Sequence, residues 1–177
     1  MLFWHSGGSI AIGRYTFRDD RMDLRFLVLG AILPDLIDTP VGLAFFGQLG
    51  AVRLVAHSLL AAGLVMTAVL LSTRRGRPRK RWMPLAIGML LHLVLDAMWS
   101  DPETLWWPFR GRDFSQTGAA SAGDYVVAVL TDWRVWALEA VGLAYLIGLA
   151  GRAGLTRPAA RTQLATSGTI DVPIDRP

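Results

Sequence analysis

Two ionisable side chains with a metal-binding spacing lie in an otherwise apolar stretch of the chain. His92 and Asp96 are four residues apart between Trp82 and Trp99, so in a helix they project from one face about a turn apart. An imidazole and a carboxylate placed in this way can bind zinc or manganese. A hydrogen bond to a neighbouring helix explains a single pair equally well, but ionisable groups inside a membrane segment usually face a partner or a water-filled cavity.

A second pair of carboxylates, Asp35 and Asp38, follows Pro34 and also shares one helix face. In one interpretation they cap the free N–H groups of a helix that starts at the proline. In the other they are metal ligands. His57, the one ionisable side chain between residues 54 and 71, favours the second interpretation because it supplies a further imidazole. The chain has no cysteine, so only nitrogen and oxygen ligands are available.

Long apolar elements must position these side chains. The 177 residues are 53% hydrophobic and 18% charged, which is too apolar for a typical soluble domain of this size. Runs long enough to cross a membrane extend over residues 54–71, 82–99 and 133–150, and a weaker run over 26–49 is interrupted by prolines and aspartates. The pattern predicts an all-α fold, a polytopic membrane helical bundle with three to four spans.

The distribution of charge predicts the orientation of this bundle. The loop over residues 72–81 is dominated by arginine and lysine, which is typical of a cytoplasmic loop and does not call for a nucleic-acid partner. Residues 100–132 lack this cationic excess and are expected outside. We expect a membrane-embedded domain over residues 1–152 and a cytoplasmic, disordered tail over 153–177, whose composition shows no helical periodicity.

On this orientation, the polar side chains of three predicted helices fall at one level of the bilayer. His57, Asp96 and Glu139 all lie within about two turns of the outer ends of their segments. For Glu139, a role as partner of Arg134 or of a neighbouring helix is the simpler explanation, so it is left out of the predicted site. The remaining groups indicate a polar centre near the outer face.

The order of these motifs resembles a known family. His5, the stretch from Gly30 to Asp38, Arg53-Leu-Val-Ala-His57, His92-Leu-Val-Leu-Asp96 and Trp107-Pro108-Phe109 together resemble the LexA-binding, inner-membrane-associated hydrolases, usually called membrane-bound metal-dependent hydrolases. These are similar, more distantly, to the helical zinc-dependent phospholipase C group. The resemblance covers roughly residues 1–110.

The resemblance implies a set of metal ligands. Asp35 or Asp38, together with His57, His92 and Asp96, would form the main metal site, and His5 would help to bind a second ion that shares a carboxylate. Val52 stands where members of the family often carry a histidine, which departs from the pattern of a full multi-metal cluster.

These residues predict a metal-dependent hydrolase in a bacterial inner membrane. A divalent metal, expected to be zinc, would activate water to hydrolyse a phosphoester or another ester of a lipid-like substrate. Whichever of Asp35 and Asp38 is not a ligand would act as general base, and the expected partners are membrane lipid and this substrate. The alternatives are a divalent-metal transporter, since some use a similar His and Asp pair, and a metal-binding membrane scaffold.

Overall fold

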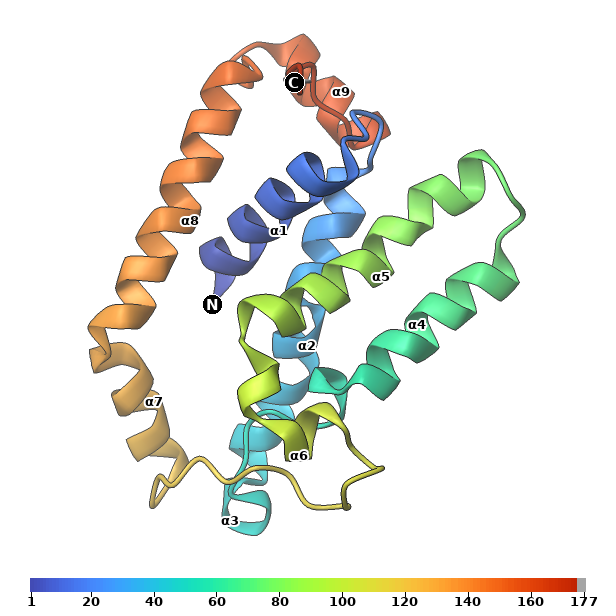
Figure 1. The fold of residues 1–177 in the computed structure, drawn as a ribbon. Helices are drawn as coiled ribbons and strands as arrows, with labels where there is room; N and C mark the ends of the chain where they lie inside the picture. The colour runs from blue at the N-terminus through green and yellow to red at the C-terminus, as the bar shows by residue number, and fades with distance from the viewer. Residues whose placement is uncertain (175–177) are drawn as a thin grey trace.

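The computed structural model describes residues 1–174, and every regular element within them is helical (Figure 1). The described residues form no β-strand, which agrees with the all-α prediction. The elements are α1 (Leu2–Phe17), α2 (Leu24–Ala44), α3 (Phe46–Leu49), η1 (Val55–His57), α4 (Leu59–Ser72), α5 (Arg77–Leu95), η2 (Met98–Ser100), α6 (Pro102–Leu105), α7 (Ala122–Thr131), α8 (Trp133–Arg152) and α9 (Pro158–Ser167).

Helix α2 is the central element, and it is continuous where the sequence suggests interruptions. Asp23 caps its first turn by accepting a hydrogen bond from the backbone N–H of Arg25 at 3.1 Å. Pro34 and Pro40 lie inside one continuous helix of 21 residues, so neither proline starts or breaks it as expected. Helix α2 packs against α5, α1 and η1, and a helix held by its neighbours tolerates internal prolines.

Two glycines allow α2 and α5 to approach each other closely. A Cβ atom at Gly30 would lie 2.0 Å from the carbonyl oxygen of Leu85, and one at Gly88 would lie 2.2 Å from that of Leu27. Only glycine therefore fits at either position without separating the backbones. This contact brings His92 of α5 beside the middle of α2.

Helices α1 and α8 make a similar contact on the other side of the molecule (Figure 1). A Cβ atom at Gly142 would lie 2.2 Å from the carbonyl oxygen of Phe3. The Glu139 carboxylate accepts a hydrogen bond from the Phe3 N–H at 2.8 Å, which satisfies a free donor at the start of α1. The expectation that Glu139 serves a neighbouring helix is thus confirmed.

Two of the helices, α2 and α8, are long and apolar enough to cross a membrane. The run over residues 54–71 gives only a 14-residue helix, α4, because its first residues form η1 instead. At about 1.5 Å per residue, α4 reaches roughly 21 Å, short of a hydrocarbon layer of about 30 Å. Helix α5 has sufficient length, but its first turns carry the basic residues of the loop, so it does not qualify on composition.

The C-terminal segment differs from the expected disorder. Helix α9 is followed by a strap in which Ile170 and Val172 are buried against α1 and α2. The Gly168 carbonyl accepts a hydrogen bond from the N–H of Leu24 at 2.8 Å, which ties the strap to the start of α2. Residues 175–177, the end of the predicted tail, lie outside the described part of the chain.

Candidate metal centre

The side chains of the three histidines and of three aspartates meet in the interior, although they come from four different helices or helix ends. His5 lies on α1, Asp35 and Asp38 on α2, His57 at the end of η1, and His92 near the end of α5, with Asp96 one residue beyond that helix. The imidazoles of His5, His57 and His92 are fully buried. Every side chain named for the site by sequence is therefore brought into one cluster.

His57 is held in one orientation by Asp38. The Nδ1 atom of His57 lies 2.8 Å from Oδ2 of Asp38. The same carboxylate accepts hydrogen bonds from the backbone N–H groups of Leu54, Ala56 and His57, at 2.8 to 3.2 Å. The Asp38 carboxylate thus holds the backbone of η1 in place by hydrogen bonds. It also occupies Nδ1 of His57, so the Nε2 atom of His57 faces the cluster. Asp38 lies behind His57 rather than beside the other candidate ligands.

His92 is fixed in the same way by a backbone carbonyl. Its Nδ1 atom lies 2.6 Å from the carbonyl oxygen of Ala31, which can only accept, so Nδ1 carries the proton. In the neutral form both His57 and His92 then present an unprotonated Nε2, and these two atoms lie 3.2 Å apart. Two lone pairs facing each other at this distance repel unless a cation or a proton lies between them.

Carboxylate oxygens complete this arrangement. Oδ1 of Asp35 lies 3.4 Å from Nε2 of His57 and 3.9 Å from Nε2 of His92. Oδ2 of Asp96 lies 3.9 Å from both of these nitrogens. Ligands about 2.0 to 2.1 Å from a tetrahedral zinc ion are separated by roughly 3.3 Å. The two nitrogens and Oδ1 of Asp35 therefore lie close enough together to hold one such ion after small side-chain adjustments, and Oδ2 of Asp96 lies beside both nitrogens.

His5 contacts three members of this set. Its Nε2 atom is 2.9 Å from Oδ1 of Asp96, and its ring stacks on that of His92 with centroids 4.1 Å apart. Its Nδ1 atom contacts the carbonyl oxygen of Met1 and lies 3.6 Å from Oδ2 of Asp35. His5, His92 and Asp96 form a group whose ligand atoms lie close together, as do Asp35, His57 and His92, and the two groups share His92.

Sequence reasoning assigned no role to Arg53, which contacts the same centre. Its Nη2 atom lies 2.9 Å from Oδ2 of Asp96, and 44% of its side chain is exposed. Asp96 follows the last turn of α5 and its N–H donates to the carbonyl of His92, so its carboxylate can reach Arg53 as well as the histidines. The signal in the sequence was the position of Arg53, four residues before His57.

A cavity of about 550 Å³ opens onto the centre. Its polar end is formed by Asp35, Asp96, Arg53 and Tyr125, and the rest of its wall is mostly apolar. Burial raises the pKa of the Tyr125 hydroxyl, so this group stays protonated and can donate a hydrogen bond. Tyr125, Val126, Val129 and Leu130 of α7 form one wall of the cavity.

The fold and the cluster define a class of protein, an all-helical membrane protein with buried histidines and aspartates at its centre. The model of the YdjM inner membrane protein family matches residues 5–156, so the chain belongs to that family. It is an inner membrane protein, in agreement with the localisation expected from the sequence. Comparison with curated proteins and with solved structures found no match.

Proposed function

We propose that this protein is a membrane-bound metal-dependent hydrolase that acts on a phosphoester or another ester of a lipid-like substrate. The observation that carries the proposal is the pair of Nε2 atoms of His57 and His92, 3.2 Å apart and flanked by Asp35 and Asp96. Two imidazoles and one carboxylate are a ligand set typical of catalytic zinc and leave a fourth position open for water, so zinc is the proposed ion. The likeness of the motif order to membrane-bound metal-dependent hydrolases points the same way.

Each residue of the centre would have a different role in metal binding or in the reaction. His57, His92 and Asp96 would hold the ion, and Asp38 and the Ala31 carbonyl would orient the two imidazoles. Asp35 is the least buried of the carboxylates and borders the cavity, so it can act as a ligand or accept a proton from water. His5 would help to hold a second ion through Asp96. The bound metal would supply an activated water and polarise the scissile group.

The number of membrane spans belongs to the same proposal. Besides α2 and α8, we infer that the hairpin of α4 and α5 enters the bilayer, which gives three to four spans. Large apolar side chains on this hairpin are exposed, among them Leu64, Leu71 and Val94. Exposed side chains of this kind are stable against lipid but not against water.

Metal content tests the site. Purified protein should contain at least one divalent ion per chain by elemental analysis, and His92→Ala and Asp96→Ala should lose most of it because the remaining ligands cannot complete a tetrahedral set. Asp113→Asn, which changes an exposed carboxylate far along the chain, serves as the matched control. Full metal content in both site variants would place the metal elsewhere.

Activity tests the reaction. The metal-loaded protein and its Asp35→Asn variant should be incubated with phospholipids and other lipid-linked esters. We expect turnover that disappears with a chelator and falls at least roughly a hundredfold in the variant, as for loss of a general base. Absence of turnover together with metal flux in proteoliposomes would favour the transporter instead.

A further inference from the structure

We propose that the cavity beside the metal centre selects amphiphiles with an anionic phosphate head group, which Arg53 recognises, while the wall between α2 and α7 takes the hydrocarbon chain. This inference rests on the proposed function and narrows its substrate from esters in general to lipid phosphoesters. The evidence lies in the position of Arg53 and in the distribution of polar and apolar side chains around the cavity.

Arg53 is placed to bind an anion that approaches the centre. One nitrogen of its guanidinium contacts Oδ2 of Asp96, and nearly half of the side chain is exposed where it borders the cavity. A guanidinium has five N–H donors in a planar fork, which matches two oxygens of a phosphate. The contact with Asp96 fixes one edge of the group and leaves further donors for a ligand.

A neutral ester would gain little binding affinity from the Arg53 guanidinium. Asp96 pairs with Arg53, and Asp35 pairs with the N-terminal amine of Met1, which also borders the cavity. A divalent ion bound by these two carboxylates would leave both cations less neutralised, so an anionic ligand would be favoured over a neutral one. Tyr125 adds a hydroxyl donor on the opposite wall. The N–H groups of Arg53 that Asp96 does not use and the Tyr125 hydroxyl fit a ligand that brings several acceptor oxygens, as a phosphate group does.

The remainder of the cavity fits a hydrocarbon chain. Apolar side chains of α2 face apolar side chains of α7 across it, and its volume lies in the usual range of ligand pockets. These side chains are Ile32, Leu36, Leu43, Val126, Val129 and Leu130. Leu36 and Leu130 are more than half exposed, so the wall is open at its side. In the inner membrane, such an opening lets a lipid chain enter from the bilayer while its head reaches the metal centre.

The test measures binding rather than turnover. Metal-loaded protein in a sugar-headed detergent is titrated calorimetrically with decylphosphonate, methylphosphonate and decanol, none of which has an ester bond to hydrolyse. Decylphosphonate should bind at least roughly tenfold more tightly than either of the others, because only it uses both Arg53 and the apolar wall. Methylphosphonate represents a soluble phosphate compound, so equal affinity for the two phosphonates would exclude a lipid substrate.

Variants test separately the polar part of the cavity, which binds the head group, and the apolar part, which binds the hydrocarbon chain. Arg53→Gln should bind decylphosphonate roughly tenfold or more weakly with its metal retained, Arg53→Lys should recover part of the loss, and exposed Arg110→Gln should match the wild type. Val129→Trp, whose larger side chain fills the apolar part of the cavity, should weaken the binding of decylphosphonate but not that of methylphosphonate.

The outcomes separate this inference from the proposed hydrolase. Selective, Arg53-dependent binding of decylphosphonate without any turnover of lipid esters would support the inference and count against the hydrolase. A metal-loaded protein that binds decanol as tightly as decylphosphonate would overturn the inference and leave the hydrolase open to other esters. If Arg53→Gln loses its metal, the comparison of ligands on the wild type and on Arg53→Lys still decides the question.

Discussion

At the scale of single residues, the structure separates two aspartates that look equivalent in the sequence. Both oxygens of Asp38 are occupied by contacts with backbone N–H groups at and beside η1 and with Nδ1 of His57. Asp35, one turn earlier on α2, keeps an oxygen directed toward His57 and His92 and borders the cavity. Asp38 thus suits the task of holding His57, whereas Asp35 suits contact with a metal or with water.

This difference predicts the effect of replacing Asp38. In Asp38→Asn the amide is a weaker acceptor and cannot keep all four contacts, so His57 loses its fixed tautomer and orientation. Metal affinity should fall roughly 10- to 100-fold, as it does when carboxylates behind metal-binding histidines are removed. Competition with a chromophoric chelator measures this affinity, and Asp113→Asn is the control. An unchanged affinity would mean that the backbone alone orients His57.

At the scale of elements, the centre depends on how closely helices approach. Asp35 and His92 lie on different helices, and their distance is set by the contact of α2 and α5 at Gly30 and Gly88. His5 reaches the same centre because α1 packs against α2 and α5 while α8 supports it from outside. Small side chains at these crossings therefore matter as much as the polar side chains themselves.

A pair of glycine substitutions tests this dependence. In Gly88→Ala the new Cβ would lie 2.2 Å from the Leu27 carbonyl, so α2 and α5 must separate, at a cost of roughly 1 to 3 kcal/mol. We expect a lower melting temperature in detergent and a lower metal content. Gly63→Ala on α4 is the matched control, because its Cβ would meet nothing within 4 Å and stability should be unchanged or slightly higher. Equal melting temperatures for the two variants would contradict the close crossing.

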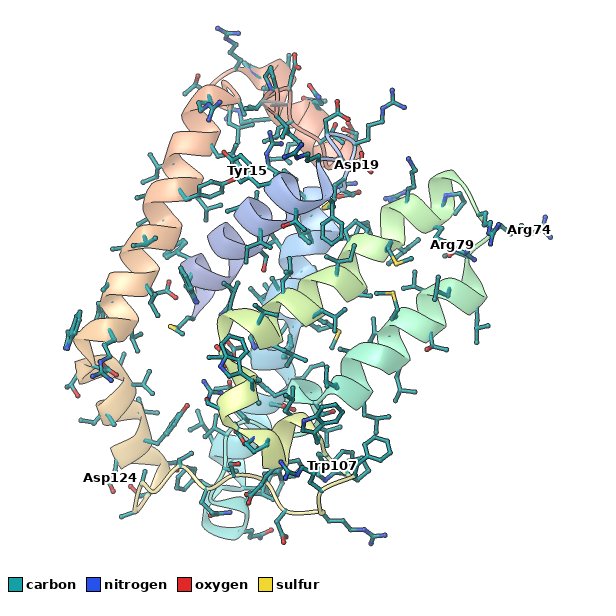
Figure 2. All side chains as sticks on the ribbon, viewed as in Figure 1. Tyr15, Asp19, Arg74, Arg79, Trp107 and Asp124 are labelled. Atoms are coloured by element: carbon teal, nitrogen blue, oxygen red, sulfur yellow. The ribbon has the colours of Figure 1, made fainter. Side chains whose placement is uncertain are left out.

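At the scale of the whole molecule, the arginines of the basic loop and the aromatic loop around Trp107 lie at different ends. Figure 2 shows Arg74 and Arg79 at the tip of the α4 and α5 hairpin, whereas Trp107 and Asp124 lie at the far end of the molecule. Exposed aromatic side chains follow α5 in the sequence at Trp99, Trp106 and Phe109, and others occur on α1 and at Trp82 of α5. Aromatic residues of this kind are typical of the membrane–water interface, and clustered arginines are typical of the cytoplasmic side.

The expected orientation can be tested by labelling, because the chain contains no cysteine of its own. Ser72→Cys, beside the basic loop, should be protected from an impermeant maleimide in intact cells, and Asp113→Cys should be labelled. Both positions are exposed, and Ser72 avoids the strain that a side chain would meet at Gly76, where φ is 115°. After the cells are opened, both cysteines should react. Labelling of Ser72→Cys alone in intact cells would reverse the orientation.

The sequence by itself indicated an all-helical fold and the histidines and aspartates of the candidate site. Long apolar runs require helices in a membrane because the backbone groups must be satisfied within each segment. Buried ionisable residues in such runs are costly, which is why His57, His92 and Asp96 stood out among the apolar residues around them.

The tertiary structure decided which groups each of these residues contacts. Three details followed only from packing: the continuous helix through Pro34 and Pro40, the replacement of the start of the 54–71 run by η1, and the ordered α9 with its buried strap. In each case contacts between distant segments outweighed local preference, since a proline, a turn and a polar tail all gain partners that the sequence does not reveal. The roles of Asp38 and Arg53 have the same origin, because a carboxylate or a guanidinium is assigned only by the groups that face it.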